Sequence, residues 1–120
     1  MTPEGLESMV AALLRRDGCA YADRVGGRGD EGIDVVGRTA DGRSVLVQCK
    51  HYRAQKVSPR EVREFAGAAA AYPGALRLFV TTNEYTRDAA RWAAEKGEVI
   101  AIDIVHLLRW ASRIWSPMNS

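Results

Sequence analysis

Hydrophobic and polar positions follow two different periods along this chain. From Thr2 to Gly18, apolar residues recur at helical spacing, which predicts a helix that Thr2 caps and Gly18 ends. Further on, short apolar runs bounded by turn residues predict strands. After that first helix, the pattern predicts strands over residues 19–24, 32–38 and 44–50, a helix over 58–72, a strand over 76–82, a helix over 86–97, a strand over 99–102 and a helix after 103.

Capping signals support the later helices. The segment Ser58-Pro59-Arg60-Glu61 has the form of a capping box with proline at the first helical position, and Pro73-Gly74 stops that helix. Thr86 and Asp103 can cap the next two helices. The last helix is expected to carry Leu107, Leu108, Trp110, Ala111 and Ile114. The order αβββαβαβα predicts an α/β fold with a mixed central sheet flanked by helices on both faces.

The composition narrows the class of protein. The chain has 120 residues, 47% of them hydrophobic and 27% charged, which predicts a single domain over residues 1–120 that buries a core. We expect no separate DNA-recognition domain and no secretion signal. We also expect no membrane span, because no apolar run approaches the ~20 residues that cross a bilayer. Cys19 and Cys49 lack a CxxC partner, which predicts a reduced, cytoplasmic chain without a zinc site.

The hairpin over residues 32–50 places polar groups where chemistry is possible. Folded about Asp41-Gly42, it sets Asp34 opposite Gln48 or Cys49, depending on the turn. Gln48 and Lys50 share one face of their strand, and Cys49 takes the other. If Asp34 pairs with Gln48, the three polar groups converge. They then form an oxygen-ligand site beside a cation, which suits a divalent metal and a phosphodiester.

The order of these motifs resembles the PD-(D/E)XK nuclease superfamily, and within it the Mrr-like restriction endonuclease domain. The resemblance covers about residues 6–110 and implies a restriction-endonuclease-like fold. The motifs that carry it are Glu7 on the first helix, Gly29-Asp30-Glu31-Gly32-Ile33-Asp34, Val47-Gln48-Cys49-Lys50, the basic segment His51-Tyr52-Arg53, and Val80-Thr81-Thr82.

The resemblance implies the roles of the site residues. Asp34, Gln48 and Lys50 would be catalytic, with Lys50 orienting the attacking water and offsetting phosphate charge. The cofactor would be Mg²⁺, for which Mn²⁺ substitutes. Its ligands would be Asp34, Gln48, the backbone carbonyl of Cys49 and Glu7. Asp30 would support the turn. Two plainer interpretations stay open: Asp34 as a strand residue facing water, and Glu7 as a first-turn acid favoured by the helix dipole.

Basic residues surround the motif although the net charge is only +2. Those predicted to contact DNA are Arg28, His51, Arg53, Lys56 and Arg60, and Arg24 and Arg63 lie close by in the sequence. A basic rim beside a carboxylate site suits a polyanionic substrate. The alternative for the residues beyond 58 is a solvated helix face.

The sequence is compatible with three functions. The first is a metal-dependent DNA endonuclease of the restriction or DNA-defence type. The second is a junction-resolving or DNA-repair nuclease of the same fold, and the third is a non-catalytic DNA-binding module. For the nuclease we expect a homodimer with DNA as partner, because cleavage of both strands of a duplex needs two active sites.

Overall fold

The fold is built on a mixed sheet, and the computed structural model describes it over residues 1–25 and 32–119. Within those residues the sheet has five strands in the order β1-β2-β3-β4-β5. β1, β2 and β3 pair antiparallel, whereas β3, β4 and β5 pair parallel. The strands are β1 (Tyr21–Arg24), β2 (Val35–Arg38), β3 (Ser44–Lys50), β4 (Leu76–Thr81) and β5 (Ile100–Ile102).

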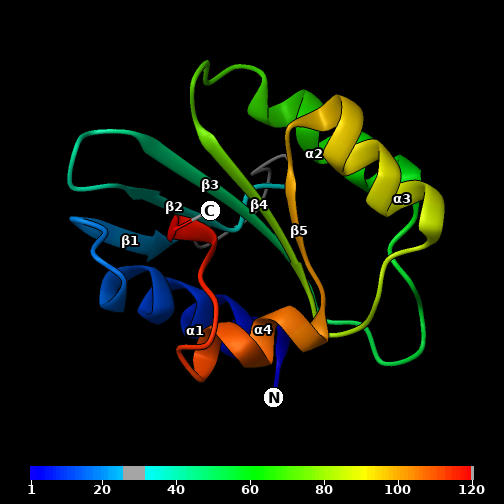
Figure 1. Cartoon of the computed structure of the whole chain (residues 1–120), viewed down its shortest axis with the longest axis horizontal. Helices are drawn as coiled ribbons and strands as arrows, with labels where there is room; N and C mark the ends of the chain where they lie inside the picture. The colour runs from blue at the N-terminus through cyan, green and yellow to red at the C-terminus, as the bar shows by residue number, and fades with distance from the viewer. Residues whose placement is uncertain (26–31, 120) are drawn as a thin grey trace.

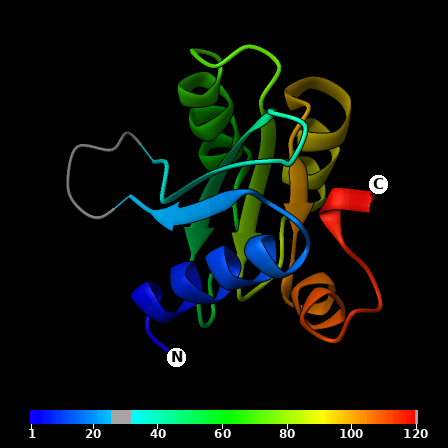
Figure 2. The same cartoon turned by 90° about the vertical axis from the view of Figure 1, so that its left-hand side faces the viewer.

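Helices cover both faces of the sheet, as Figure 1 shows. One face carries α1 (Pro3–Arg16) and α4 (Ile104–Ala111), which lie side by side below the sheet in Figure 2. The other carries α2 (Pro59–Ala69) and α3 (Arg87–Trp92), and α3 runs on into a π-helical turn, Ala93–Gly97. A short 3-10 turn, Pro117–Asn119, follows α4. The predicted order αβββαβαβα and the mixed sheet are confirmed.

Several predicted elements are shorter in the structure, such as the helix expected over 58–72, which ends at Ala69, and two of them involve residues with a positive φ. The strand expected over 32–38 begins only at Val35, and Gly32 has a φ of 85°, which excludes it from a strand. The last helix ends at Ala111, so Ile114 does not belong to it. Arg113 has a φ of 64°, which a right-handed helix cannot contain, and Ile114 is 74% exposed.

The core consists of two hydrophobic clusters separated by the sheet. On the α1 and α4 face, Val45 and Val47 of β3 pack with Leu6, Leu14 and other residues of those helices. On the α2 and α3 face, Leu46 packs with α2. Since side chains alternate along a strand, Gln48 and Lys50 emerge at the end of β3 toward α2. The packing of β3 therefore determines which helix lies beside the motif.

Asp17, directly after α1, ties the end of the chain to the first helix. Its carboxylate accepts hydrogen bonds from Trp110 Nε1 (2.8 Å), Ser116 Oγ (2.7 Å) and Arg16 Nε (2.9 Å). Arg16 also donates to the carbonyl oxygens of Trp110 and Ala111 at the end of α4. Partial burial alone would raise the pKa of Asp17, but the hydrogen bonds from Arg16, Ser116 and Trp110 outweigh it and hold the pKa below its ordinary value.

Asp17→Asn should destabilise the protein by about 1–2 kcal/mol at neutral pH, because the variant loses charge-assisted hydrogen bonds. A carboxylate whose pKa is lower in the folded than in the unfolded state stabilises the fold above its unfolded pKa. That stabilisation disappears as the pH falls through the folded pKa. The variant should therefore differ from wild type at pH 7 and converge with it below the ordinary Asp pKa of 3.8.

The measurement is urea unfolding of both proteins across the acidic range. Asp23→Asn, at an exposed position on β1, serves as control and should follow wild type throughout. A difference between Asp17→Asn and wild type that stays constant with pH would contradict the role given to the Asp17 charge.

Candidate active site

The end of β3 brings the motif residues against β2. The register of β2 and β3 pairs Val35 with Val47 at the end of the ladder, and Asp34 directly precedes Val35. The backbone N–H of Asp34 donates to the Val47 carbonyl (2.7 Å). The Asp34 carboxylate accepts a hydrogen bond from the backbone N–H of Cys49 (2.7 Å). Asp34 is thus bonded to Val47 through its backbone and to Cys49 through its side chain, and Cys49 is one of the two neighbours that the sequence left open for it.

Gly32 makes room for the Gln48 amide. A Cβ atom at Gly32 would lie 3.1 Å from Gln48 Nε2 and 3.3 Å from Oε1, closer than most side chains tolerate. The positive φ of Gly32 also favours glycine. Gln48 is only 9% exposed. A small pocket of about 100 Å³ opens beside it, lined by Gly32, Gln48, Lys50, Glu61, Glu64 and Phe65.

Glu7 reaches the same end of the sheet from α1, although it has a partner of its own. Arg24 Nε donates to Glu7 Oε1 at 3.0 Å, and the Glu7 side chain is 18% exposed. Burial raises the pKa of the Cys49 thiol well above its usual range, and the nearby Asp34 and Glu7 charges raise it further. Both carboxylates therefore lie near Cys49. Cys49 packs against the α1 and α4 cluster, on the opposite face from Gln48 and Lys50, as the strand alternation predicted.

The segment that follows β3 is held by hydrogen bonds to the end of β4. Thr82 Oγ1 accepts from the Tyr52 backbone N–H and donates to the Tyr52 carbonyl, both at 2.9 Å. Asn83 Nδ2 donates to the Arg53 carbonyl (2.9 Å), and Val57 bridges to Tyr85. The paired threonines noted in the sequence thus include one that fixes the backbone of the basic segment. No motif in the sequence indicated a role for Asn83.

The basic side chains of this segment point to solvent, and some have acidic neighbours. Arg53 is exposed. Lys56 Nζ lies 3.6 Å from Glu84, and Arg60 Nε lies 3.1 Å from Glu64. Exposed ion pairs of this kind are weak, so both cations can exchange these partners for phosphate. His51 is half-buried at the end of β3. Arg28 and Asp30 lie outside the described residues.

Comparison with known proteins decides the family. The family model for the restriction endonuclease domain Mrr_cat matches residues 1–111. The chain belongs to this Mrr restriction endonuclease family. A curated relative, the type IV methyl-directed restriction enzyme EcoKMrr of Escherichia coli (strain K12), is 32% identical over 117 residues, which cover 90% of this chain and 38% of that protein. This Mrr domain thus spans less than half the length of its curated relative.

Solved structures share the fold of this Mrr domain. The DNA modification-dependent restriction endonuclease AspBHI matches with a TM-score of 0.70 and 21% identity, over 98% of this chain and 33% of that one. The restriction endonuclease MspJI, solved with a 27-mer oligonucleotide, matches with a TM-score of 0.63 and 21% identity, over 95% and 29% of the two chains. Identities this low show a common fold, and they confirm the restriction-endonuclease-like architecture that the motifs indicated.

Family membership implies dependence on a divalent metal in general, and the donor set of this Mrr domain suits a hard cation. Asp34, Gln48 and Glu7 all offer oxygen atoms. Among the described residues, no three His, Cys, Asp or Glu side chains are close enough to hold a metal together. An ion here would rely on the Gln48 amide, a backbone carbonyl and water beside the carboxylates. A divalent cation that keeps several water ligands suits such a site.

Gln48→Glu should tighten Mn²⁺ binding several-fold, because it replaces the neutral amide of Gln48 with a negative charge beside the Asp34 carboxylate. The change is nearly isosteric, so the packing against Gly32 should persist. Without metal the variant should be less stable than wild type, because a carboxylate replaces an amide at a position only 9% exposed. Calorimetric titration with Mn²⁺ and thermal unfolding with and without the ion measure both effects.

Gln55→Glu is the matched control, since it adds the same charge at an exposed position of the basic segment. It should leave Mn²⁺ affinity close to wild type. Equal affinities of Gln48→Glu and wild type would place Gln48 beyond reach of the ion.

Proposed function

We propose that this domain hydrolyses DNA phosphodiesters with Mg²⁺, as a nuclease of the restriction type. The observation that carries the proposal is the Asp34 carboxylate held by the Cys49 backbone N–H, beside Gln48 and Lys50, in a chain of the Mrr restriction endonuclease family. The methyl-directed relative and the oligonucleotide complex of MspJI support DNA as the partner.

Asp34 supplies the charge of the motif. A carboxylate offers about four lone-pair positions, so a bond from Cys49 is compatible with a role as metal ligand. That bond also fixes the orientation of the carboxylate. A Mg²⁺ ion held there would lower the pKa of a bound water and neutralise charge on the phosphate. Gln48, Glu7 and the Cys49 carbonyl would complete the protein ligands.

Lys50 would act on the phosphate directly. It lies two residues after Gln48 and lines the same pocket. Its ammonium group can bind a phosphate oxygen, orient the attacking water and offset the charge that develops in the transition state. Arg53, Lys56, Arg60 and His51 would bind neighbouring phosphates. Arg28 would contact DNA as well, and Asp30 would keep the supporting role that the family resemblance implies.

The proposal extends to assembly and location. Two active sites are needed to cut both strands of a duplex, so we propose a homodimer on DNA. Cys19 and Cys49 are free thiols, which agrees with a reducing, cytoplasmic environment. Among the described residues, no helix has both the length and the apolar character that crossing a membrane requires.

Restriction and junction resolution share this chemistry and differ in the DNA that they select. Incubation with methylated, unmethylated and branched DNA, in Mg²⁺, Mn²⁺ or EDTA, separates the two functions. Cleavage of linear duplex supports restriction, whereas strong preference for branched DNA supports a resolving or repair nuclease. Binding without cleavage in any metal would point to a non-catalytic module.

Asp34→Asn should abolish nicking of supercoiled plasmid and Lys50→Met should slow it strongly, for different reasons. The Asn amide oxygen still accepts from Cys49, so the fold persists while the charge that attracts the metal is lost. Lys50→Met keeps the length of the side chain and removes its charge, which should cost about 100- to 1,000-fold in rate, the range for loss of one oxyanion donor. Metal affinity should fall for Asp34→Asn and hold or rise for Lys50→Met.

Plasmid nicking in Mg²⁺ and DNA binding in EDTA, each with both variants, distinguish these effects. DNA binding in EDTA should hold or rise for Asp34→Asn and drop slightly for Lys50→Met. Undiminished nicking by Asp34→Asn, in a preparation freed of contaminating nuclease, would overturn the active-site assignment.

The basic segment should set the salt dependence of DNA binding. Each phosphate contact contributes about 0.9 to the slope of log affinity against log salt on duplex DNA. The triple variant Arg53→Ala, Lys56→Ala, Arg60→Ala should therefore lower that slope by up to about 2.7, three contacts at this rate. Fluorescence anisotropy at several salt concentrations, in EDTA, measures it.

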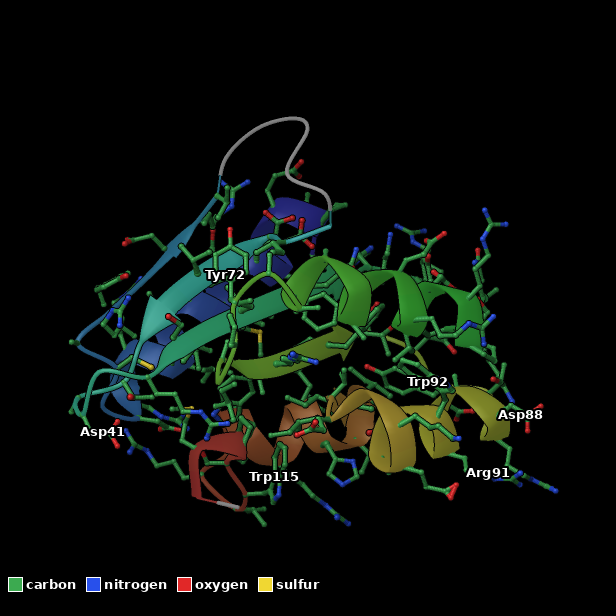
Figure 3. The ribbon with its side chains drawn as sticks, turned by 90° about the horizontal axis from the view of Figure 1, so that it is seen from above. Asp41, Tyr72, Asp88, Arg91, Trp92 and Trp115 are labelled. Carbon is green, nitrogen blue, oxygen red and sulfur yellow. The ribbon has the colours of Figure 1, made fainter. Side chains whose placement is uncertain are left out.

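The matched control removes three cations elsewhere: Arg38→Ala, Arg43→Ala and Arg109→Ala. Arg38 and Arg43 flank the hairpin turn at the opposite end of β3 from Lys50. Figure 3 shows this turn, where Asp41 is labelled, at the opposite end of the molecule from α3, where Asp88 and Arg91 are labelled. The control should leave the slope near the wild-type value. Equal slopes for the two triple variants would remove the basic segment from the DNA contact.

A further inference from the structure

Glu61, in the first turn of α2, does more than cap its helix. Its Oε2 accepts from the backbone N–H of Ser58 (2.8 Å) and from Ser58 Oγ (3.0 Å), which completes the capping box. Its Oε1 accepts from the hydroxyl of Tyr52. Both carboxylate oxygens are thus occupied by donors of the protein, which fixes the carboxylate in place.

This anchored carboxylate lies beside the catalytic lysine. Glu61 and Lys50 line the same small pocket together with Gln48. Partial burial would raise the pKa of Glu61, but the hydrogen bonds from Tyr52 and Ser58, together with the nearby Lys50 charge, hold it below its ordinary value. Glu61 is therefore ionised at neutral pH. Burial and the bond to Glu61 raise the pKa of Tyr52 to about 12, so its phenol remains a donor.

The hydrogen-bond partners of Glu61 belong to the segment that directly follows Lys50. Tyr52 comes two residues after Lys50, and its backbone is fixed by Thr82. Ser58 closes the same segment at the start of α2. A capping box requires only the Ser58 bonds. The Tyr52 bond and the place beside Lys50 are therefore additional features, and they bring a fixed negative charge to the lysine.

We propose that Glu61 is a positioning residue for Lys50, holding its ammonium group at the Gln48 side of the pocket, where the scissile phosphate would lie. This inference rests on the proposed nuclease function and assigns Glu61 no contact with substrate or metal. A negative charge close to a phosphate weakens DNA binding. Glu61 is thus expected to oppose binding slightly while favouring turnover, a combination that helix capping by itself does not produce.

Glu61→Gln separates the two roles, because glutamine also serves in a capping box. The variant should unfold near the wild-type temperature and bind DNA in EDTA as tightly as wild type or more tightly. Its single-turnover cleavage rate should fall at least tenfold, and its KM should not rise. Glu61→Ala, which loses the cap too, should lose both stability and rate. Tyr52→Phe, which removes one anchor, should give an intermediate rate.

Two further variants test whether the effect on cleavage is particular to Glu61 and depends on Lys50. Asp88→Asn removes an exposed first-turn carboxylate from the neighbouring helix α3 and should cleave within twofold of wild type. If Glu61 acts through Lys50, adding Glu61→Gln to Lys50→Ala should change the residual single-turnover rate less than twofold. Groups that act as one unit show such non-additive losses.

The possible results distinguish failure of this inference from failure of the proposed function. Wild-type turnover by Glu61→Gln, with an unchanged unfolding temperature, would reduce Glu61 to a helix cap and overturn the inference. A tenfold loss on top of Lys50→Ala would also overturn it, because Glu61 would then act without the lysine. A wild-type protein that cleaves no DNA overturns the proposed function together with the inference, whereas an active wild type with an unaffected Glu61→Gln overturns the inference alone.

Discussion

The pairing of β3 on both of its edges is the constraint on which this structure depends. β3 pairs antiparallel with β2 and parallel with β4. Its side chains enter both hydrophobic clusters, with Val45 and Val47 on one face and Leu46 on the other. A shift of one residue would exchange the two faces, which the packed clusters prevent. The end of β3 is thereby held in one position, and Gln48, Cys49 and Lys50 are presented from a rigid strand rather than from a loop.

Charges near this strand end are balanced by the protein itself. Asp34 is held by the Cys49 backbone N–H, Glu7 by Arg24, and Glu61 by Tyr52 and Ser58. Lys50 lines one pocket together with Gln48 and with Glu61 of the first turn of α2. Because Gln48 is neutral, this site offers a metal less negative charge than a site with a carboxylate at the same position. The orientation of the remaining carboxylates consequently matters more, and each of these three has a hydrogen-bond donor that sets it.

The basic segment between β3 and α2 is ordered by the same end of the sheet. Thr82 and Asn83, directly after β4, bind its backbone, and Ser58 and Glu61 close it at the helix. Backbone contacts leave the side chains of Arg53 and Lys56 directed to solvent, where DNA phosphates can reach them. A segment ordered before binding loses less conformational entropy when DNA arrives than a flexible one.

The sequence by itself determined the kinds of element, their order and the face of β3 that carries Gln48 and Lys50, because helical and strand periods are local properties. It also indicated Ser58 and Glu61 as a capping box, a motif confined to four residues. The tertiary structure decided which partners meet: Asp34 with the Cys49 N–H, Arg24 with Glu7, and Tyr52 with Glu61 beside Lys50. It also decided where β2 begins and where α4 ends. These contacts depend on strand register and on how helices pack across the sheet, and residues far apart in the chain set both.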